Sequence, residues 1–164
     1  RRSVNVARGA YAITGGLGGL GLRTSALLAD GGACGVSLAS RRGLSARHEP
    51  ATEAQLRMVR ATVVACDGSD AVDAGALVRV APPIGVLHAA GASDEGLLVQ
   101  VYACRLHQLY APKAVGAWHL WEQCHVASMS RASHAGLLSH TGRSAHSWVT
   151  KEPANSHSAR LYSV

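Results

Sequence analysis

The sequence predicts an α/β fold, a doubly wound parallel sheet, from two observations. Short apolar runs alternate with stretches whose apolar residues recur at helical spacing between residues 9 and 124. The first apolar run also leads through a glycine-rich turn directly into the first helical pattern. Strands and helices that alternate at this pitch build a parallel sheet with right-handed crossovers. A chain of 164 residues forms one domain at most, and we expect its core at residues 1–124.

The glycine-rich turn is the strongest local signal. Between a strand predicted at 9–13 and a helix predicted at 22–30 lies Thr14-Gly15-Gly16-Leu17-Gly18-Gly19-Leu20-Gly21. Glycines at 16, 18 and 21 let the backbone turn sharply, approach a pyrophosphate and pack the helix close to the strand. The helix N-terminus adds N–H groups and partial positive charge. The turn therefore predicts a Rossmann-like dinucleotide site, and its apolar, periodic flanks argue against a flexible linker.

Further strands and helices alternate after this first unit. Apolar runs predict strands at 33–39, 61–67 and 84–91. Helical spacing predicts helices at 52–59, 72–80, 97–110 and 113–124. We expect the first of these helices to begin at a capping box, Thr52-Glu53-Ala54-Gln55, and Ser69 or Asp70 to cap the second. Pro112 is expected to separate the last two helices.

Residues 125–164 differ from the rest of the chain. They are rich in serine and histidine and contain no apolar run long enough for a central strand. The sheet is therefore expected to be incomplete at its C-terminal side, and this region is either a degenerate continuation of the sheet or a poorly ordered tail. The histidines show no metal-ligand spacing and lie near no C-x-x-C pair, so we expect no metal site.

Composition and charge exclude several partners. The net charge of +6 is spread along the chain without a basic stripe interleaved with aromatic residues, so nucleic acid is not an expected partner. No apolar run approaches membrane-spanning length, and no signal peptide precedes the first strand. The cysteines at 34, 66, 104 and 124 are widely spaced, which is typical of a reducing compartment. We therefore expect a cytoplasmic protein.

The end of the second predicted strand indicates which dinucleotide binds. The position holds Ser40-Arg41-Arg42, where an NAD site would place a carboxylate for the ribose hydroxyls. A guanidinium binds phosphate through a planar fork of donors, and Ser40 adds a hydroxyl. This pattern favours NADPH, although a surface arginine pair unrelated to a ligand is the alternative. Asp67, at the end of the third strand, is either an adenine contact or a residue that only begins the next helix.

Six sequence blocks in this order resemble the short-chain dehydrogenase/reductase superfamily, and more narrowly the ketoreductase domain of type I polyketide synthases and fatty acid synthases. The resemblance covers about residues 9–121. The blocks are the glycine turn 14–21, Leu38-Ala39-Ser40-Arg41-Arg42-Gly43, Cys66-Asp67 with Ser69-Asp70, His88-Ala89-Ala90-Gly91, Asp94-Glu95-Gly96-Leu97-Leu98, and Ala111-Pro112-Lys113 with Gly116-Ala117-Trp118.

The resemblance implies an activity and a cofactor site. Members reduce a β-ketoacyl thioester on an acyl carrier protein to the β-hydroxyacyl form with NADPH, beside neighbouring synthase domains. The implied cofactor residues are Thr14, Gly15, Gly16, Leu17, Gly18, Gly19, Leu20, Gly21, Ser40, Arg41, Cys66, Asp67, Ala89, Ala90 and Gly91. In the family, the Asp contacts adenine and the Ala-Ala-Gly turn lines the side of the ribose and nicotinamide.

The resemblance also implies catalytic positions. In the family a tyrosine donates the proton, a serine hydrogen-bonds the carbonyl, and a lysine acts on the tyrosine. Lys113 matches the lysine and Ser133 the serine, with the strand that would deliver Ser133 at 126–132. The position thirteen residues after Ser133 holds His146 where the family has tyrosine, and an imidazolium is a chemically conceivable donor.

Two other functions stay open at this level. One is a non-catalytic NADP-binding or structural module of a multidomain synthase, which would keep the glycine turn without the reaction. The other is a methyltransferase that uses S-adenosylmethionine, which shares the glycine turn. The Arg41-Arg42 pair counts against the methyltransferase, because that family usually has an acidic residue there.

Overall fold

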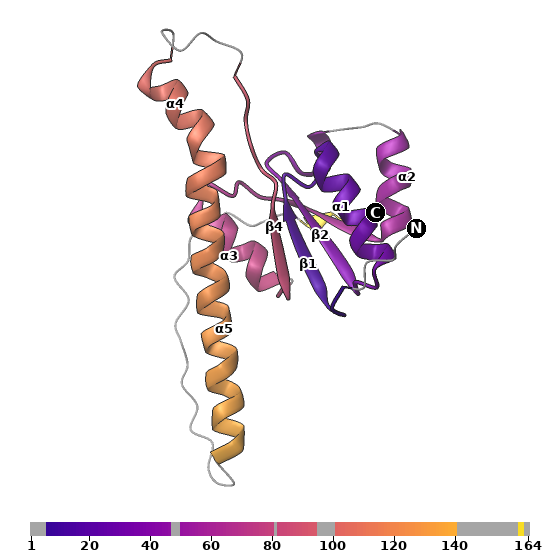
Figure 1. Ribbon diagram of the computed structural model, residues 1–164, viewed down its shortest axis with the longest axis vertical. Coiled ribbons are helices and arrows are strands. Elements are labelled where there is room, and N and C mark those ends of the chain that lie inside the picture. The colour runs from indigo at the N-terminus through magenta and orange to yellow at the C-terminus, as the bar shows by residue number, and fades with distance from the viewer. Residues whose placement is uncertain (1–5, 47–49, 81, 95–100, 141–160, 163–164) are drawn as a thin grey trace.

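The core of the molecule is one β-sheet, seen in Figure 1, with the strand order β4-β1-β2-β3-β5. The computed structural model describes residues 6–46, 50–80, 82–94, 101–140 and 161–162. The strands are β1 (Ala10–Thr14), β2 (Gly35–Ser40), β3 (Ala61–Ala65), β4 (Gly85–His88) and β5 (Leu161–Tyr162). The first four pair in parallel, and β5 pairs antiparallel with β3. The α/β fold with a parallel sheet is therefore confirmed.

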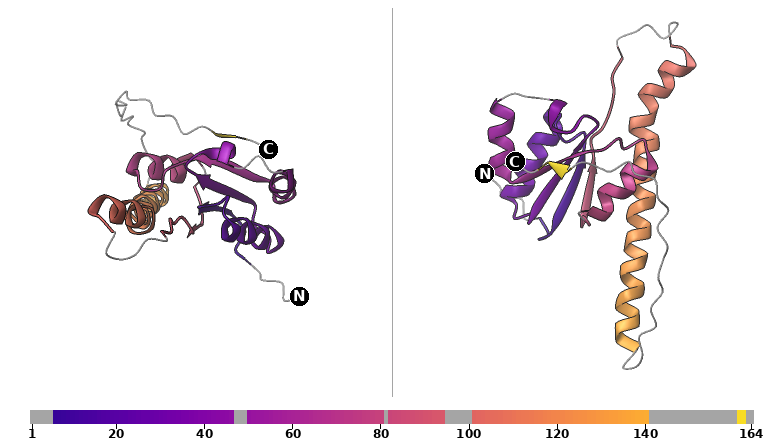
Figure 2. Two further views of the ribbon diagram at one scale, coloured as in Figure 1. Left: turned by 90° about the horizontal axis from the view of Figure 1, so that it is seen from above. Right: turned by 180° about the vertical axis from the view of Figure 1, so that it is seen from behind.

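Helices cover both faces of this sheet (Figures 1 and 2). The helical elements are α1 (Gly19–Asp30), the 3₁₀ turn η1 (Gly43–Ala46), α2 (Pro50–Val59), α3 (Ala71–Val80), α4 (Ala103–Tyr110), the π-helical turn η3 (Ala111–Val115) and α5 (Gly116–His140). Helices α1 and α2 lie on one face, whereas α3 and α5 pack together on the other. Along the described helices, none has both the length and the apolar run that crossing a membrane requires.

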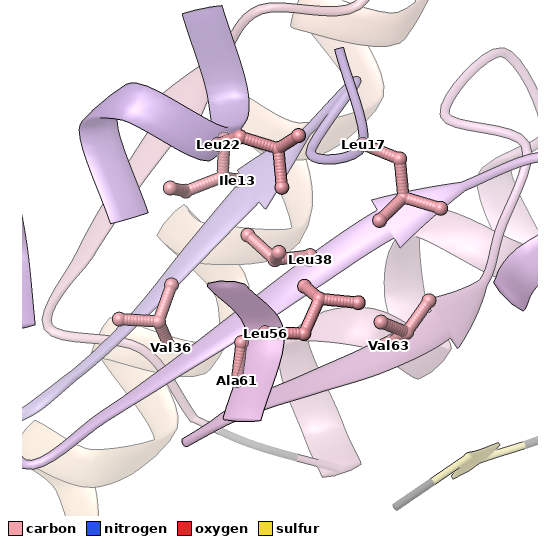
Figure 3. Close-up of a cluster of buried hydrophobic side chains, with 8 residues drawn as sticks. All are labelled: Ile13, Leu17, Leu22, Val36, Leu38, Leu56, Ala61 and Val63. Carbon is pink, nitrogen blue, oxygen red and sulfur yellow. The ribbon is translucent and has the colours of Figure 1, made fainter. Parts of the chain in front are cut away.

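The larger apolar cluster lies between the sheet and helices α1 and α2, as Figure 3 shows. Its members are Ile13, Leu17, Leu22, Val36, Leu38, Leu56, Ala61 and Val63. Ile13, Leu38 and Val63 come from three adjacent strands and are fully buried. A second cluster on the opposite face includes Leu77 of α3 and Leu120 of α5. A parallel sheet buried on both faces needs such continuous apolar strands.

The parallel register brings the ends of the strands to one edge of the sheet. Thr14 at the end of β1 pairs with Ala39 on β2 and with His88 on β4. Ser40 at the end of β2 pairs with Ala65 on β3. The loops that follow these four strands therefore open at the same edge, and ligands of open α/β sheets bind there.

The starts of helices α2 and α3 test the predicted caps. Helix α2 begins at Pro50, so Thr52 is not its cap but a buried residue inside the first turn. Proline is favoured at the first helical position, where its missing N–H costs nothing. For α3, of the two predicted candidates Ser69 and Asp70, the cap is Asp70, whose Oδ1 accepts the N–H groups of Val72 at 2.8 Å and Asp73 at 3.0 Å.

Pro112 lies between two α-helices as predicted, but in a π-helical turn that joins them, and the strand that the resemblance implies at 126–132 is wrong. Helix α4 leads through η3 into α5, which continues to His140. The extra residue of a π-helical turn accommodates Pro112, which has no N–H to donate. Beyond Gly116 no glycine or proline interrupts the sequence until Gly136. Residues 125–140 therefore extend a helix through the boundary that we expected at residue 124, and Figure 1 shows α5 reaching well past the sheet.

Candidate cofactor-binding site

A cavity of about 310 Å³ lies at the carboxyl edge of the sheet. Its walls are the loops that follow β1, β2, β3 and β4, with η3 closing one side. It is lined by Thr14, Gly15, Leu17, Gly18, Ala39, Ser40, Arg41, Cys66, Asp67, Gly68, Ala89, Ala90, Gly91 and Pro112. Strand β1 lies between β4 and β2, which is where the strand order reverses in a doubly wound sheet.

The glycine turn needs glycine at three points for different reasons. Gly15 has a φ of +65°, and a Cβ built there would lie 2.6 Å from the carbonyl oxygen of Ala89. A Cβ on Gly16 would lie 2.6 Å from the Cβ of Leu38. A Cβ on Gly21 would lie 2.5 Å from the carbonyl oxygen of Gly16. The turn is therefore pressed against the loop after β4, against β2 and against α1. Gly16 and Gly21 are two of the three predicted positions, and a Cβ on the third, Gly18, would lie 3.1 Å from the carbonyl oxygen of Gly15.

The N-terminus of α1 has no side-chain cap. Gly18 is the N-cap residue and has no side chain to accept the first N–H groups of the helix. Its own N–H donates to the carbonyl oxygen of Gly15 at 2.9 Å, which closes the turn. The first turn of the helix contains no acidic residue. Its N–H groups and partial positive charge are therefore available to a phosphate.

The cationic wall of the cavity comes from the end of β2. Ser40 and Arg41 both line the cavity, and Arg41 is exposed to solvent. Arg42, the next residue, does not line it. A guanidinium in the wall of the same cavity is suited to a second phosphate group of the same ligand. This donor set and the glycine cradle fit a phosphorylated dinucleotide.

The loop after β3 holds its carboxylate in one position. Oδ1 of Asp67 accepts hydrogen bonds from the N–H of Ser69 at 3.0 Å and from its hydroxyl at 2.9 Å. The N–H of Asp67 donates to Oδ2 of Asp73 in α3 at 2.8 Å. Three hydrogen bonds, two from Ser69 and one to Asp73, thus fix Asp67 at the cavity.

Cys66 precedes this loop and is buried. Burial, together with the negative charges of Asp73, Asp67 and Asp70, raises the pKa of the Cys66 thiol from 9.0 to about 12. The folded chain holds the proton of the Cys66 thiol more tightly than the unfolded chain does. This difference stabilises the fold fully below about pH 9, and the stabilisation is lost as the pH rises towards 12. The thiol is therefore protonated and unreactive at neutral pH.

Thiol labelling at pH 8 tests this state. We expect iodoacetamide to modify the exposed Cys34 and Cys104 quickly and Cys66 only after denaturation in urea, because the reagent requires a thiolate that it can reach. Mass spectrometry of peptides reports each site separately. Modification of Cys66 in the folded chain at the rate of Cys34 would contradict the buried, protonated state.

A histidine links the glycine turn to η3. His88, at the end of β4, lies 2.7 Å through Nδ1 from the Thr14 hydroxyl. Its Nε2 lies 3.0 Å from the carbonyl oxygen of Lys113. A carbonyl can only accept, so Nε2 carries the hydrogen, and in the neutral ring Nδ1 accepts from Thr14. A Cβ on Gly91 would lie 3.4 Å from Cε of Lys113, which places the lysine chain beside the cavity wall.

The structure brings most of the predicted cofactor residues together. Eleven of them line the cavity: Thr14, Gly15, Leu17, Gly18, Ser40, Arg41, Cys66, Asp67, Ala89, Ala90 and Gly91. Gly16 and Gly21 lie behind the wall, where they let the turn pack against β2 and α1. Gly19 and Leu20 belong to the first turn of α1 and do not line the cavity.

The predicted catalytic residues are not brought together. Lys113 lies at the cavity wall, whereas Ser133 lies in α5. Twenty residues of helix separate them, which at about 1.5 Å per residue is about 30 Å along the axis. His146 lies outside the described residues. No tyrosine lines the cavity in the part of the chain that the structure describes.

Three residues of the site were not among the predicted site residues: Gly68, Pro112 and His88. Gly68 and Pro112 line the cavity. Each is the sequence neighbour of a predicted site residue, Asp67 or Lys113, and this was the only feature in the sequence that could have pointed to them. His88 stands in the sequence block before Ala89, but its role could not be predicted because its two hydrogen-bond partners are remote in sequence.

The sheet topology, glycine turn and uncapped helix N-terminus define a Rossmann-like dinucleotide-binding fold. The family model of the KR domain matches residues 9–151. The chain therefore belongs to the ketoreductase domain family of polyketide synthases, within the short-chain dehydrogenases/reductases, and the family expected from the sequence is confirmed. Members of this family are oxidoreductases that use a nicotinamide cofactor.

Individual relatives agree with this assignment. The chain is 34% identical over 147 residues to the spectinabilin polyketide synthase system protein NorB of Streptomyces orinoci, covering 82% of the chain and 7% of that protein. It is 37% identical over 124 residues to a mycocerosic acid synthase-like polyketide synthase of Mycobacterium tuberculosis, covering 68% of the chain and 6% of that protein. The chain thus spans a small fraction of these relatives, which are multidomain synthases.

Solved ketoreductase structures share the fold. An A-type ketoreductase from a modular polyketide synthase superposes with a TM-score of 0.63 at 32% identity, over 71% of this chain and 26% of that one. The first ketoreductase of the tylosin synthase superposes with a TM-score of 0.66 at 28% identity, over 74% of this chain and 27% of that one. The similarity therefore covers about a quarter of each ketoreductase.

Proposed function

We propose that this chain binds NADPH and serves the reduction of a β-ketoacyl thioester, carried on an acyl carrier protein, to the β-hydroxyacyl form. The observation that carries the proposal is the cavity that Ser40 and Arg41 line together with the glycine turn leading into α1. Bound NADPH would supply the hydride. Neighbouring synthase domains would supply the substrate.

Each wall of the cavity has a proposed part in binding. The N–H groups of the glycine turn and α1 bind the pyrophosphate, and Ser40 and Arg41 bind the 2′-phosphate. Asp67 and the backbone at Cys66 contact the adenine. In this proposal the turn from Ala89 to Gly91 lines the nicotinamide side. The Lys113 side chain, which runs beside Gly91, would then lie near the reacting carbonyl, where a cation favours developing negative charge.

A second candidate is a non-catalytic NADP-binding module of a synthase, in which residues 1–124 are the nucleotide-binding core. The distance along α5 between Lys113 and Ser133 favours it, because the family's reaction needs both groups at one carbonyl. Catalysis by this chain requires the segment with Ser133 and His146 to reach the cavity. Assaying NADPH oxidation with a β-ketoacyl thioester separates the two: turnover supports the reductase, and NADPH binding without turnover supports the module.

The nucleotide assignment is tested by titration with NADPH and NADH, followed by nucleotide fluorescence. We expect Arg41→Ala to weaken NADPH binding about tenfold to a hundredfold, as loss of a charged hydrogen bond does, and to leave NADH nearly unchanged. Arg42→Ala is the matched control, since it removes the same charge one residue outside the cavity. Equal weakening of both nucleotides by Arg41→Ala would refute the 2′-phosphate assignment.

A further inference from the structure

His88 lies where three segments of the cavity meet. Its ring has a hydrogen bond on each nitrogen, one to the buried Thr14 of the glycine turn and one to the backbone of Lys113 in η3. A ring with both nitrogens bonded in this way has one defined orientation and one defined neutral tautomer. His88 therefore joins two walls of the cavity that are remote in sequence.

The π-helical turn η3 is fitted to this histidine. Pro112 donates no backbone hydrogen bond, and the N–H of Gly116 bonds to the carbonyl oxygen of Ala111, five residues back. A Cβ on Gly116 would lie 3.2 Å from Cε1 of His88 and 3.2 Å from the carbonyl oxygen of Gly68. The absence of a side chain at position 116 thus lets the turn approach both the His88 ring and the loop after β3.

The hydrogen bond from His88 fixes the backbone position from which the Lys113 side chain extends. The carbonyl of Lys113 is held by His88, and the side chain of the same residue runs beside Gly91 at the cavity wall. A lysine has a long flexible chain, so the position of its ammonium depends on where its backbone is anchored. The bond from Nε2 ties η3 to the end of β4.

We propose that His88 is a positioning residue, which anchors η3 so that the Lys113 side chain lies over the nicotinamide side of the cavity. The inference rests on the proposed function for the identity of the ligand. The anchoring of η3 by His88 does not require bound NADPH, so the positioning role and the proposed function can be tested separately.

Two conservative variants separate the nitrogens of His88. The amide NH₂ of glutamine reaches about as far as Nε2 and can still donate to the Lys113 carbonyl, whereas the shorter asparagine reaches only the position of Nδ1 and Thr14. We therefore expect His88→Gln to retain the anchor and His88→Asn to lose it. His107→Asn, at an exposed position in α4, is the matched control and is expected to behave as the unmodified chain.

The first readout requires no cofactor. Amide hydrogen exchange of residues 113–116 should be about tenfold faster in His88→Asn and close to the unmodified rate in His88→Gln. Equal exchange in the two variants would overturn the inference. If His88→Asn fails to fold by circular dichroism, Thr14→Val takes its place beside His88→Gln. Both keep a donor to the Lys113 carbonyl and lose only the bond to Thr14, so faster exchange of residues 113–116 in either would overturn the inference.

The second readout follows the lysine itself. Saturating NADPH should slow modification of Lys113 by an amine-reactive ester about tenfold in the unmodified chain and in His88→Gln, but less than twofold in His88→Asn. The preference for NADPH over NADH, which we assign to Arg41, should be the same in all three. Protection that persists in His88→Asn would overturn the positioning role. Absence of NADPH binding to the unmodified chain would instead refute the proposed function, and the exchange rates alone then decide the role of His88.

Discussion

Replacing Gly15 with alanine is expected to lower the free energy of unfolding by about 2–5 kcal/mol. The left-handed φ of +65° costs a side chain about 1–2 kcal/mol by itself. The new Cβ would also lie 2.6 Å from the carbonyl oxygen of Ala89 and 2.8 Å from Cα of Ala90. Both are backbone atoms of the loop after β4, so the loop would have to move. Urea denaturation followed by circular dichroism measures the loss.

Gly19→Ala is the matched control for this variant. Gly19 lies four residues further along the same turn, at the first position of α1, and a Cβ there would meet nothing within 4 Å. Because alanine has the higher helix propensity, we expect a gain of about 0.5–1 kcal/mol. If both variants change stability equally, the strain and crowding at Gly15 are not what makes the turn require glycine.

Replacing Leu38 with alanine is expected to cost about 2–5 kcal/mol, the range for deleting a fully buried leucine. Leu38 lies in the central strand β2, has no exposed surface, and packs between Ile13 and Val63 in the cluster of Figure 3. It also supports the site, because a Cβ on Gly16 would lie 2.6 Å from its Cβ. We therefore expect weaker NADPH binding alongside the lower midpoint in urea.

Leu27→Ala provides the comparison for Leu38→Ala. Leu27 lies in α1 with 61% of its surface exposed, so its truncation should change stability by less than about 0.5 kcal/mol. The m-value should stay the same in both variants if only stability changes. A similar loss in the two variants would mean that the buried cluster is not the main source of stability on that face of the sheet.

The glycine turn and the strand-end residues of the site could be predicted from the sequence, because the signals for them are local. Gly15, Gly16 and Gly21 are required by the turn that they form, and Arg41 and Asp67 follow directly on apolar strands. Once those strands are parallel, their carboxyl ends meet at one edge, so position in the sequence is enough to predict proximity in space. The same reasoning limited the cap of α3 to Ser69 or Asp70, and Asp70 bonds to groups two and three residues away.

Helix boundaries were predicted less well because the signals compete. Thr52 satisfies the pattern of a cap, but Pro50 is also a favoured first residue, and the helix begins there. Pro112 is a strong helix breaker in an α-helix, yet the wider π-helical turn accommodates it. The segment 126–132 contains alanine, methionine and arginine, which favour helix, and this propensity prevails over the expected strand.

The sequence by itself determined the parallel sheet, the glycine turn and the strand-end residues around the cavity, since each depends on spacing within a few residues. Only the tertiary structure decided that His88 joins Thr14 to Lys113, and that α5 carries Ser133 away from Lys113. The physical reason is range. A hydrogen bond between residues 74 or 25 positions apart depends on how strands and helices pack, which no local pattern encodes.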